Sequence, residues 1–227
     1  MASMNSWARS LKSWLDVFLE SKCPLCERST PGVICLTCQR QLQQCQLPHS
    51  YQPAALPVLA WGEYGGALKR AIASLKYENH PELARPLGQW LGQSWLNAKL
   101  PIKNSIIVVP IPMHPDKIAQ RGFNQAELIA QSFCETTGLP LKRHGLARIQ
   151  ATEAQFKLSP QAREQNLVGA FALGKDFLRQ RPTKTVLLLD DIYTTGATIR
   201  SAAQVLRRQQ VSVWGVGVVA IAGRRSV

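Results

Sequence analysis

The run VLLLDDIYTTGAT, residues 186–198, constrains the fold more than any other stretch of the chain. Its four consecutive aliphatic residues, Val186 to Leu189, are typical of a parallel strand that is covered on both faces. Asp190 and Asp191 follow at the carboxyl end of this strand, where ligands of open α/β sheets bind. The sequence therefore predicts an α/β fold with a parallel sheet and a ligand site at this strand end.

The loop after the two acids consists of small and hydroxyl-bearing residues and leads into a helix. Hydroxyls and backbone N–H groups at a helix N-terminus can hold a phosphate. The two carboxylates would repel a phosphate, so they need a different partner, and ribose hydroxyls or a hydrated Mg²⁺ ion suit them. A sugar phosphate with free hydroxyls satisfies both halves, and an ordinary strand–helix turn with an acidic start is the alternative. The loop residues are Thr194, Thr195, Gly196, Ala197 and Thr198.

The chain of 227 residues carries a formal net charge of +13, which favours polyanionic partners such as nucleic acid, acidic lipid or a phosphorylated ligand. It has no uninterrupted apolar stretch of about 18 residues, so we expect no transmembrane segment. The N-terminus does not resemble a signal peptide, because Lys12 and Asp16 interrupt its apolar residues. We therefore expect a cytoplasmic protein whose six cysteines are reduced or metal-bound.

Residues 1–20 form the first predicted unit, which contains an amphipathic helix over 6–20. This helix either packs on the domain body or docks on a membrane surface or a partner protein. Its apolar face consists of Trp7, Leu11, Trp14, Leu15, Phe18 and Leu19.

Residues 21–46 form the second predicted unit, which contains two CxxC pairs separated by eight residues. Four thiolates at this spacing can close a tetrahedral Zn²⁺ site, and the metal would stabilise a module too short to bury its own core. A disulfide pair is the less favoured alternative without secretion. Cys45 is a candidate spare ligand, and Cys134 is predicted to be a core residue of a helix. The predicted zinc ligands are Cys23, Cys26, Cys35 and Cys38.

The third predicted unit, residues 58–227, follows a Pro- and Gln-rich stretch at 46–57 that we interpret as a linker. Residues 150–166 are polar and are predicted to be a mobile loop, with a short helix beginning at Ser159. The predicted strands are 58–64, 105–112, 141–149, 186–189 and 211–222, and the predicted helices lie around 68–75 and at 82–97, 124–137 and 198–209.

The 186–198 run closely resembles the phosphoribosyl-pyrophosphate (PRPP) motif of type I phosphoribosyltransferases. Further motifs together resemble the ComF family of competence-associated proteins, which includes proteins named GntX, over nearly the whole chain after residue 20. These motifs are the CxxC pairs, LKY at 75–77, VVPIPMHPDKIAQRGFNQAELIA at 108–130, Arg148 with Thr152 and Gln155, and Arg163 with Asn166.

This resemblance implies a phosphoribosyltransferase-like domain preceded by a zinc module. It implies that the loop after Pro112 holds pyrophosphate, with Arg121 as the main anion contact and Lys76 as a second; the alternative for each is a solvated surface residue. An arginine fork and a lysine point charge both suit such a ligand, and Mg²⁺ would accompany PRPP. Asp190, Asp191 and Arg121 are the predicted catalytic residues. The predicted ligand-binding residues are Asp190, Asp191, Tyr193, Thr194, Thr195, Gly196, Ala197, Thr198, Lys76 and Arg121.

The fold family also has a mobile hood over its ligand, and residues 148–166 are placed to form it. Arg148, Gln155 and Arg163 would then close on pyrophosphate or on an acceptor, with a solvated loop as the alternative. One residue departs from a family pattern: 6-oxopurine salvage enzymes have an acid three residues after the second aspartate, where this chain has Thr194. A hydroxyl is a poor general base at neutral pH, so purine salvage of that kind is disfavoured. His114 is a second candidate acid or base.

Two functions from different classes follow. In the first, the chain binds PRPP and handles imported single-stranded DNA during natural transformation, with a competence helicase or another part of the DNA-uptake machinery as partner. In the second, it is an active phosphoribosyltransferase that acts on a base, an amine or a nucleic-acid end and releases pyrophosphate. A PRPP-sensing regulator is a weaker third, since no helix-turn-helix signature supports it. We expect a cytoplasmic location, with the inner face of the membrane as a place of association.

Overall fold

The computed structural model describes residues 21–102, 105–150 and 169–223, and its centre is a five-stranded sheet with the order β1-β2-β7-β6-β3. The four strands from β2 to β3 are parallel, and β1 joins the edge of β2 antiparallel. The predicted parallel α/β fold is therefore confirmed. The strands are β1 (Tyr51–Gln52), β2 (Val58–Glu63), β3 (Ile106–Pro110), β6 (Thr185–Tyr193) and β7 (Val213–Ile221), and β4 (Leu146–Arg148) pairs with β5 (Phe171–Leu173) in a separate sheet.

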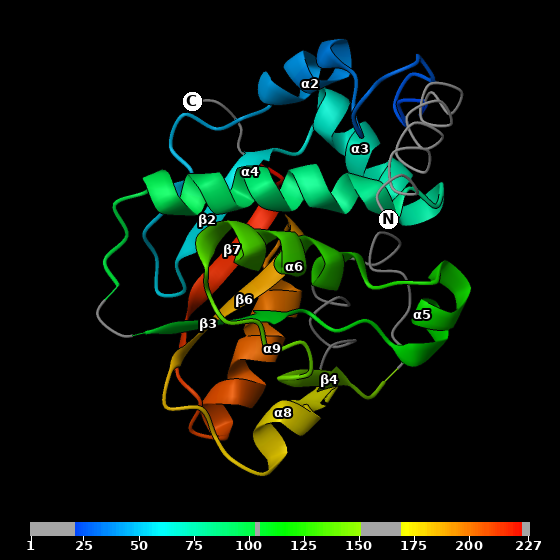
Figure 1. The fold of residues 1–227 in the computed structure, drawn as a ribbon. Coiled ribbons are helices and arrows are strands. Elements are labelled where there is room, and N and C mark those ends of the chain that lie inside the picture. Colours follow the sequence, from blue (N-terminus) through cyan, green and yellow to red (C-terminus); the bar gives the residue numbers. More distant parts are fainter. Residues whose placement is uncertain (1–20, 103–104, 151–168, 224–227) are drawn as a thin grey trace, which may run out of the picture.

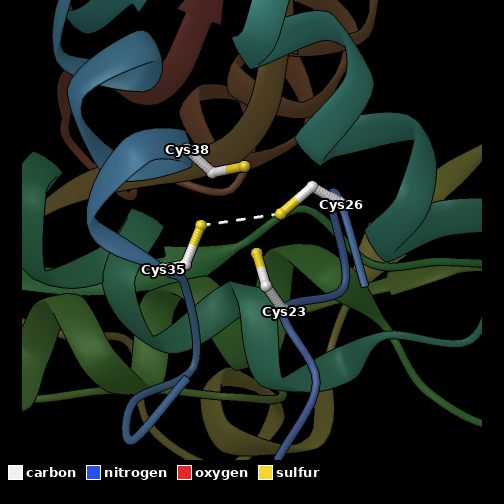
Figure 2. Close-up of side chains that lie close together, drawn as sticks. All are labelled: Cys23, Cys26, Cys35 and Cys38. Carbon is white, nitrogen blue, oxygen red and sulfur yellow. Dashed lines mark hydrogen bonds between the residues drawn. The ribbon is translucent and has the colours of Figure 1, made fainter. Parts of the chain in front are cut away.

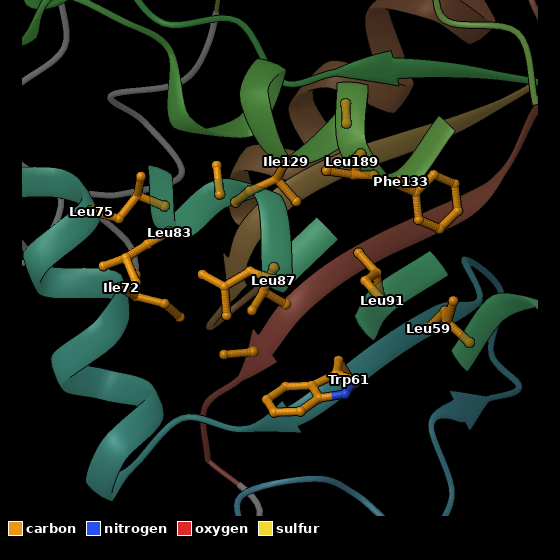
Figure 3. Close-up of a cluster of buried hydrophobic side chains, with 14 of the residues drawn as sticks. Leu59, Trp61, Ile72, Leu75, Leu83, Leu87, Leu91, Ile129, Phe133 and Leu189 are labelled. Carbon is orange, nitrogen blue, oxygen red and sulfur yellow. The ribbon is translucent and has the colours of Figure 1, made fainter. Parts of the chain in front are cut away.

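Helices cover both faces of the sheet (Figure 1). On one face, α3, α4 and α6 bury a large aliphatic and aromatic cluster against the strands (Figure 3). On the other face, α9 packs against the sheet together with β5 and α8. The helices are α2 (Leu36–Gln43), α3 (Gly66–Tyr77), the 3₁₀ turn η1 (Pro81–Leu83), α4 (Ala84–Asn97), α5 (Pro115–Arg121), α6 (Gln125–Thr137), α8 (Lys175–Leu178) and α9 (Ala197–Arg208).

The central strand β6 explains why the sequence shows a continuous apolar run here rather than alternating apolar and polar residues. Along β6, Leu187 and Leu189 face the cluster under α4 and α6, whereas Val186 and Leu188 face the cluster under α9. All four side chains are fully buried. Because both faces of the strand are covered, every position must be apolar, as in other parallel sheets.

Two glycines let α4 approach α6 closely. A Cβ atom on Gly88 would lie 2.5 Å from the carbonyl oxygen of Ile129, and one on Gly92 would lie 2.8 Å from Cβ of Thr136. Any larger residue at either position would therefore force the helices apart. This contact fixes α6, whose N-terminus reaches the cavity described below.

The chain turns in opposite directions on either side of the β3–β6 pair, which creates a topological switch point. From β3 it passes through α6 on one face to Leu141, which forms a parallel bridge with Val108. From β6 it passes through α9 on the other face to β7. Ligands of open α/β sheets bind outside the carboxyl ends of the strands at such a point.

Several predicted elements differ from the structure. The stretch at 46–57 is not simply a linker, because β1 lies in it and Leu47 donates a backbone hydrogen bond to Trp61. The segment 141–149 is not one strand, since Leu141 makes only a bridge to β3 before β4 pairs with β5. The short helix α5 lies in the predicted loop after Pro112, and α2, β5 and α8 were not predicted.

The predicted strand over 186–189 is too short, because β6 continues through both acids to Tyr193. Its neighbour β7 is equally long and pairs with Asp190, Ile192 and Tyr193. Backbone pairing to β7 therefore holds the acidic residues in an extended conformation. The remaining predicted elements are found with shifts of a few residues at their ends.

The predicted N-terminal helix and most of the predicted hood, including Thr152, Gln155, Ser159, Arg163 and Asn166, lie outside the described residues. Within the described part of the chain, no helix is long and apolar enough to cross a membrane.

Candidate functional site

The four cysteines of the two CxxC pairs converge in space, as predicted (Figure 2). All four Sγ atoms lie within 4.8 Å of one another, and those of Cys26 and Cys35 are 3.5 Å apart. Four sulfurs bound to one zinc ion at 2.3 Å stand about 3.8 Å apart, so this arrangement fits a tetrahedral metal site.

A tight turn and the start of helix α2 bring these four thiols together. Cys23 accepts backbone hydrogen bonds from Cys26 and Glu27, which closes a tight turn, and Cys35 caps α2, whose first turn carries Cys38. Backbone and side-chain hydrogen bonds from Arg28 lower the pKa of the Cys26 thiol to about 6. A lowered thiol pKa favours the thiolate that a metal requires.

The other two cysteines lie away from this cluster. Cys45 packs between α2 and α3, where its thiol donates weakly to the carbonyls of Gln41 and Gly65 at 3.7 and 3.8 Å. The suggestion that Cys45 is a spare ligand is therefore not supported. Cys134 is buried in α6, and burial raises the pKa of its thiol to about 12, in agreement with the predicted core role.

The cysteine module is joined to the helix that reaches the second site. Leu42 of α2 is fully buried in the main core, and Gln41 accepts a 3.1 Å hydrogen bond from Arg70 of α3. The C-terminal end of α3 carries Lys76 and Tyr77, which line a large cavity. Helix α3 thus connects the cysteine cluster to that cavity.

The cavity has a volume of about 830 Å³ and opens at the switch point between β3 and β6. Most of its lining comes from the end of β6, the N-terminus of α9, the C-terminus of α3, the loop after β3, helix α5 and the start of α6. Tyr64 and Arg148 of β4 complete it. Nine of the ten predicted ligand-binding residues lie in this lining, and they are Lys76, Arg121, Asp190, Asp191, Tyr193, Thr194, Gly196, Ala197 and Thr198.

The acidic pair lines the cavity. Asp191 is 4% exposed, and its Oδ2 atom lies 2.5 Å from Nζ of Lys76. Burial alone would lower the pKa of Lys76, but the charge of Asp191, the hydrogen bond to it and the charge of Asp190 together outweigh burial and raise this pKa. Asp190 accepts a 2.9 Å hydrogen bond from the backbone N–H of Asp191. Burial and the neighbouring charge of Asp191 raise the pKa of Asp190 to about 8.

Gly196 shapes the 194–198 loop between β6 and α9. It adopts a left-handed conformation with φ of 75° and caps the N-terminus of α9. A Cβ atom at this position would collide with the ring of Tyr193, so the loop requires glycine for both its conformation and its packing. Thr195 does not line the cavity: its Oγ1 accepts from Ala197 and its carbonyl accepts from Arg200.

Three cations line the cavity on the side of α5, and two of them were not in the predicted ligand-binding set. Arg121 donates a 2.5 Å hydrogen bond to Gln125 and stacks on Tyr77, with Cζ 5.5 Å from the ring centroid. Burial, followed by the charges of Arg148 and Arg121, lowers the pKa of Lys117. Burial also lowers the pKa of Arg148, against the opposing charge of Asp190. Because the charges of Arg148 and Arg121 lower the pKa of Lys117, an anion bound between these side chains would relieve their repulsion.

His114 has a structural role. Its Nδ1 atom accepts a 3.3 Å hydrogen bond from the backbone N–H of Asp116 and so caps α5. It is not part of the cavity lining, and the structure does not support its prediction as an acid or base. The described lining contains no carboxylates other than Asp190 and Asp191.

Sequence reasoning missed several polar and aromatic lining residues. Asn124 was predicted only as the start of a helix. Its side chain also donates a 3.1 Å hydrogen bond to the carbonyl of Ile111, which joins the N-terminus of α6 to the end of β3. The RGFNQ motif was the available signal for this residue. The other missed residues are Tyr64, Tyr77, Asn79, Gln120 and Gln125.

The fold and the cavity together define the class of this protein. It is a phosphoribosyltransferase-like α/β protein, in which a strand, an acidic pair and a loop of small and hydroxyl-bearing residues meet at the switch point of a parallel sheet. A four-cysteine cluster precedes that domain.

Comparison with known proteins gives the family. No family model matches the chain. It is 30% identical over 203 residues to DNA utilization protein YhgH of Salmonella typhi, and the matched region covers 86% of this chain and 82% of that protein. It is 28% identical over 183 residues to competence protein F of Haemophilus influenzae, with coverages of 78% and 80%. The chain therefore belongs to the family of these proteins, the ComF family that its motifs resemble.

Among solved structures, adenine phosphoribosyltransferase from Leishmania donovani is 13% identical to the chain. The match has a TM-score of 0.39 and covers 83% of this chain and 80% of that one. This TM-score is too low to assign the fold. The fold class therefore rests on strand order, strand register and the position of the motif.

Proposed function

We propose that this ComF-family protein binds PRPP in the 830 Å³ cavity and handles imported single-stranded DNA during natural transformation. The observation that supports the first half is that one cavity is lined by a helix N-terminus, by an acidic pair and by a cluster of three cations. The helix is α9, the acids are Asp190 and Asp191, and the cations are Lys117, Arg121 and Arg148. PRPP has a group to match each of these: a phosphate, a ribose with free hydroxyls, and a pyrophosphate.

Each part of the cavity has a role in this proposal. The backbone N–H groups of Ala197 and Thr198 and the hydroxyl of Thr194 hold the 5′-phosphate at the helix N-terminus. Asp190 and Asp191 accept hydrogen bonds from the ribose hydroxyls. The three cations near α5 hold the pyrophosphate, where arginine offers a two-point contact and lysine a point charge.

The residues present also fit a magnesium ion that would accompany PRPP. Carboxylate oxygens are the ligands that Mg²⁺ takes from proteins. Asp191 and Asp190 bring two carboxyl groups to the cavity, and a bound cation would displace the proton that the raised pKa of Asp190 leaves on its carboxyl. Bound Mg²⁺ would supply neutralisation of the charge on the pyrophosphate.

The alternative function is transfer of the phosphoribosyl group. In that reaction an acceptor atom forms a bond to the anomeric carbon, the bond to the pyrophosphate oxygen breaks with its electron pair, and the acceptor loses a proton. Lys117, Arg121 and Arg148 would stabilise the leaving pyrophosphate, and the phosphate loop would hold the sugar in position. The complete phosphate loop and acidic pair favour this candidate.

A single assay separates the two candidates. We would measure pyrophosphate release from Mg²⁺–PRPP with a panel of bases, amines and single-stranded DNA. Release that requires one acceptor and is lost in Asp191→Asn supports a transferase. Binding of PRPP without release supports a site that serves binding alone, and the absence of both rejects the proposal.

The DNA-handling half rests on the family and on charge. The relatives carry the names competence protein F and DNA utilization protein YhgH, and the chain has a net charge of +13. From residue 177 to residue 227 the only acids are Asp190 and Asp191, both in the cavity. Arg181 donates a 3.0 Å hydrogen bond to Gln209, which joins the loop after α8 to the end of α9. The exposed basic residues of this stretch, which we call the C-terminal basic residues, are Arg179, Arg181, Lys184, Arg200, Arg207 and Arg208.

A polyanion such as single-stranded DNA suits these residues, because its phosphates would meet several exposed cations. We further propose that the protein works in the cytoplasm or at the inner face of the membrane. Its protein partner would be a competence helicase or another component of the DNA-uptake machinery.

A further inference from the structure

Tyr77 places an aromatic ring at the mouth of the cavity. It is the last residue of α3 and lines the cavity, yet 70% of it is exposed. The residue before it, Lys76, is ion-paired with the buried Asp191. The ring of Tyr77 therefore belongs to the residue that directly follows the lysine of the Lys76–Asp191 ion pair.

Arg121 fixes the orientation of this ring. Its guanidinium lies over the ring of Tyr77 with Cζ 5.5 Å from the centroid, while a 2.5 Å hydrogen bond to Gln125 holds the same guanidinium on α6. A cation held over an aromatic ring stabilises that ring in place. The 70% exposure of Tyr77 leaves the rest of the ring surface open to a second planar group.

The rest of the cavity suits such a group. Its volume of about 830 Å³ lies near the upper end of the range for sites that enclose a small-molecule ligand. Tyr64, Asn79 and Gln120 also line it and are not used by the phosphate or ribose contacts proposed above. Side-chain amides can donate to and accept from the edge of a heterocycle.

We propose that Tyr77 is the platform on which the cavity stacks a nucleobase beside the bound phosphoribosyl group. This inference rests on the proposed function, because it requires the phosphate loop and the acidic pair to hold a ribose phosphate next to the ring. Tyr77 is then a specificity-determining residue that selects planar heterocycles. A free nucleotide and the 5′-phosphorylated end of single-stranded DNA present the same chemistry.

The test compares two probes that differ only in the base. Ribose 5-phosphate and AMP are titrated into the full chain by calorimetry. The wild type should bind AMP about tenfold more tightly, within the range that base stacking on an aromatic side chain produces. Tyr77→Ala should bind AMP no better than ribose 5-phosphate and leave ribose 5-phosphate affinity unchanged, whereas Tyr77→Phe should keep the tenfold difference.

Three results would overturn the inference. The first is equal affinity of the wild type for both probes. The second is an AMP preference that survives in Tyr77→Ala, and the third is an equal loss of both affinities in that variant. Ribose 5-phosphate binding without AMP preference rejects the platform and keeps the proposed function, whereas failure of both probes rejects both. Because Tyr77 is exposed, the alanine variant should keep the wild-type thermal midpoint, which is checked by circular dichroism.

Competition identifies the source of the base. Displacement of AMP by a 5′-phosphorylated oligonucleotide, but not by its 5′-hydroxyl counterpart, would assign the platform to the end of a DNA strand. Displacement by neither oligonucleotide would assign it to a free nucleotide.

Discussion

The Nζ atom of Lys76 lies 2.5 Å from Oδ2 of Asp191, so an ion pair joins the last turn of α3 to the end of β6 across the cavity. The lysine side chain is 16% exposed and that of the aspartate 5%. The pair leaves Asp190 as a second carboxyl beside it. Burial, followed by the charge of Asp191, raises the pKa of Asp190 to about 8, and the charge of Lys76 opposes this rise.

Removal of this lysine should destabilise the fold. We expect Lys76→Met to lower the free energy of unfolding at pH 7 by about 3 kcal/mol, because it leaves Asp191 as a buried charge without its partner. Lys76→Met with Asp191→Asn should recover most of this loss, and the exposed Lys69→Met on the same helix should change it by less than about 0.5 kcal/mol. Urea unfolding measures all three, and similar values for Lys76→Met and Lys69→Met would contradict the role of the pair.

The raised pKa of Asp190 predicts a pH-dependent stability. Its carboxyl keeps a proton in the folded state up to about pH 8, whereas the unfolded chain loses it near pH 4. The contribution is therefore complete below about pH 4 and is lost as the pH rises to about 8. We expect the free energy of unfolding of the wild type to fall over this interval more than that of Asp190→Asn. Parallel slopes for the two proteins between pH 4 and pH 8 would show that the carboxyl is not perturbed.

Local sequence patterns predicted the parts of the site that are continuous in the chain. The strand through Leu189, the two acids and the loop to Thr198 follow from an apolar run, a change to polar residues and glycine. The pairing of β6 with β7 through Tyr193 did not follow, because strand ends are set by the length of the neighbouring strand. The N-cap of α6 at Asn124 and the left-handed Gly138 after it were readable, since both are local.

Only part of the cation cluster was predicted from the sequence. The resemblance implied that Arg121 and Arg148 contact pyrophosphate, whereas Lys117 was not predicted as a ligand-binding residue. Local patterns do not show that α5 and β4, which are distant in sequence, line the same cavity. Tyr77 was visible only as part of the LKY motif, and its exposure depends on how α3 meets α5 and α6. Four cysteines, by contrast, were predictable from spacing, because a metal site imposes a fixed distance between ligands.

Metal removal should affect both ends of α3. We expect one Zn²⁺ per chain by elemental analysis, and Cys35→Ser should lose it because only three thiols remain. PRPP affinity should fall with the metal, since α2 packs on α3 through Leu42 and Gln41. Cys45→Ser is the matched control and should keep the metal. Full metal content in Cys35→Ser would reject the four-cysteine site.

The C-terminal basic residues at the end of α9 should control the salt dependence of DNA binding. We expect Arg207→Gln with Arg208→Gln to reduce the slope of log affinity against log salt by about 1.4, the value for two phosphate contacts to a single strand. Lys22→Gln with Lys69→Gln removes the same charge from exposed positions that are not among the C-terminal basic residues. Fluorescence anisotropy with single-stranded DNA measures both slopes, and equal slopes for the two double variants would exclude a specific role of the C-terminal basic residues.

Binding of PRPP at the phosphate loop is the most direct test of the account, and calorimetry with Mg²⁺–PRPP measures it. We predict one site per chain in the wild type and a loss of at least about tenfold in affinity for Gly196→Ala, whose new Cβ atom would collide with Tyr193. Gly138→Ala is the control, because Gly138 has nearly the same φ of 73° with open space around it and lies at the far end of α6. Wild-type binding that survives in Gly138→Ala and fails in Gly196→Ala is the predicted result. No PRPP binding by the wild type, or unchanged binding by Gly196→Ala, would contradict the central claim.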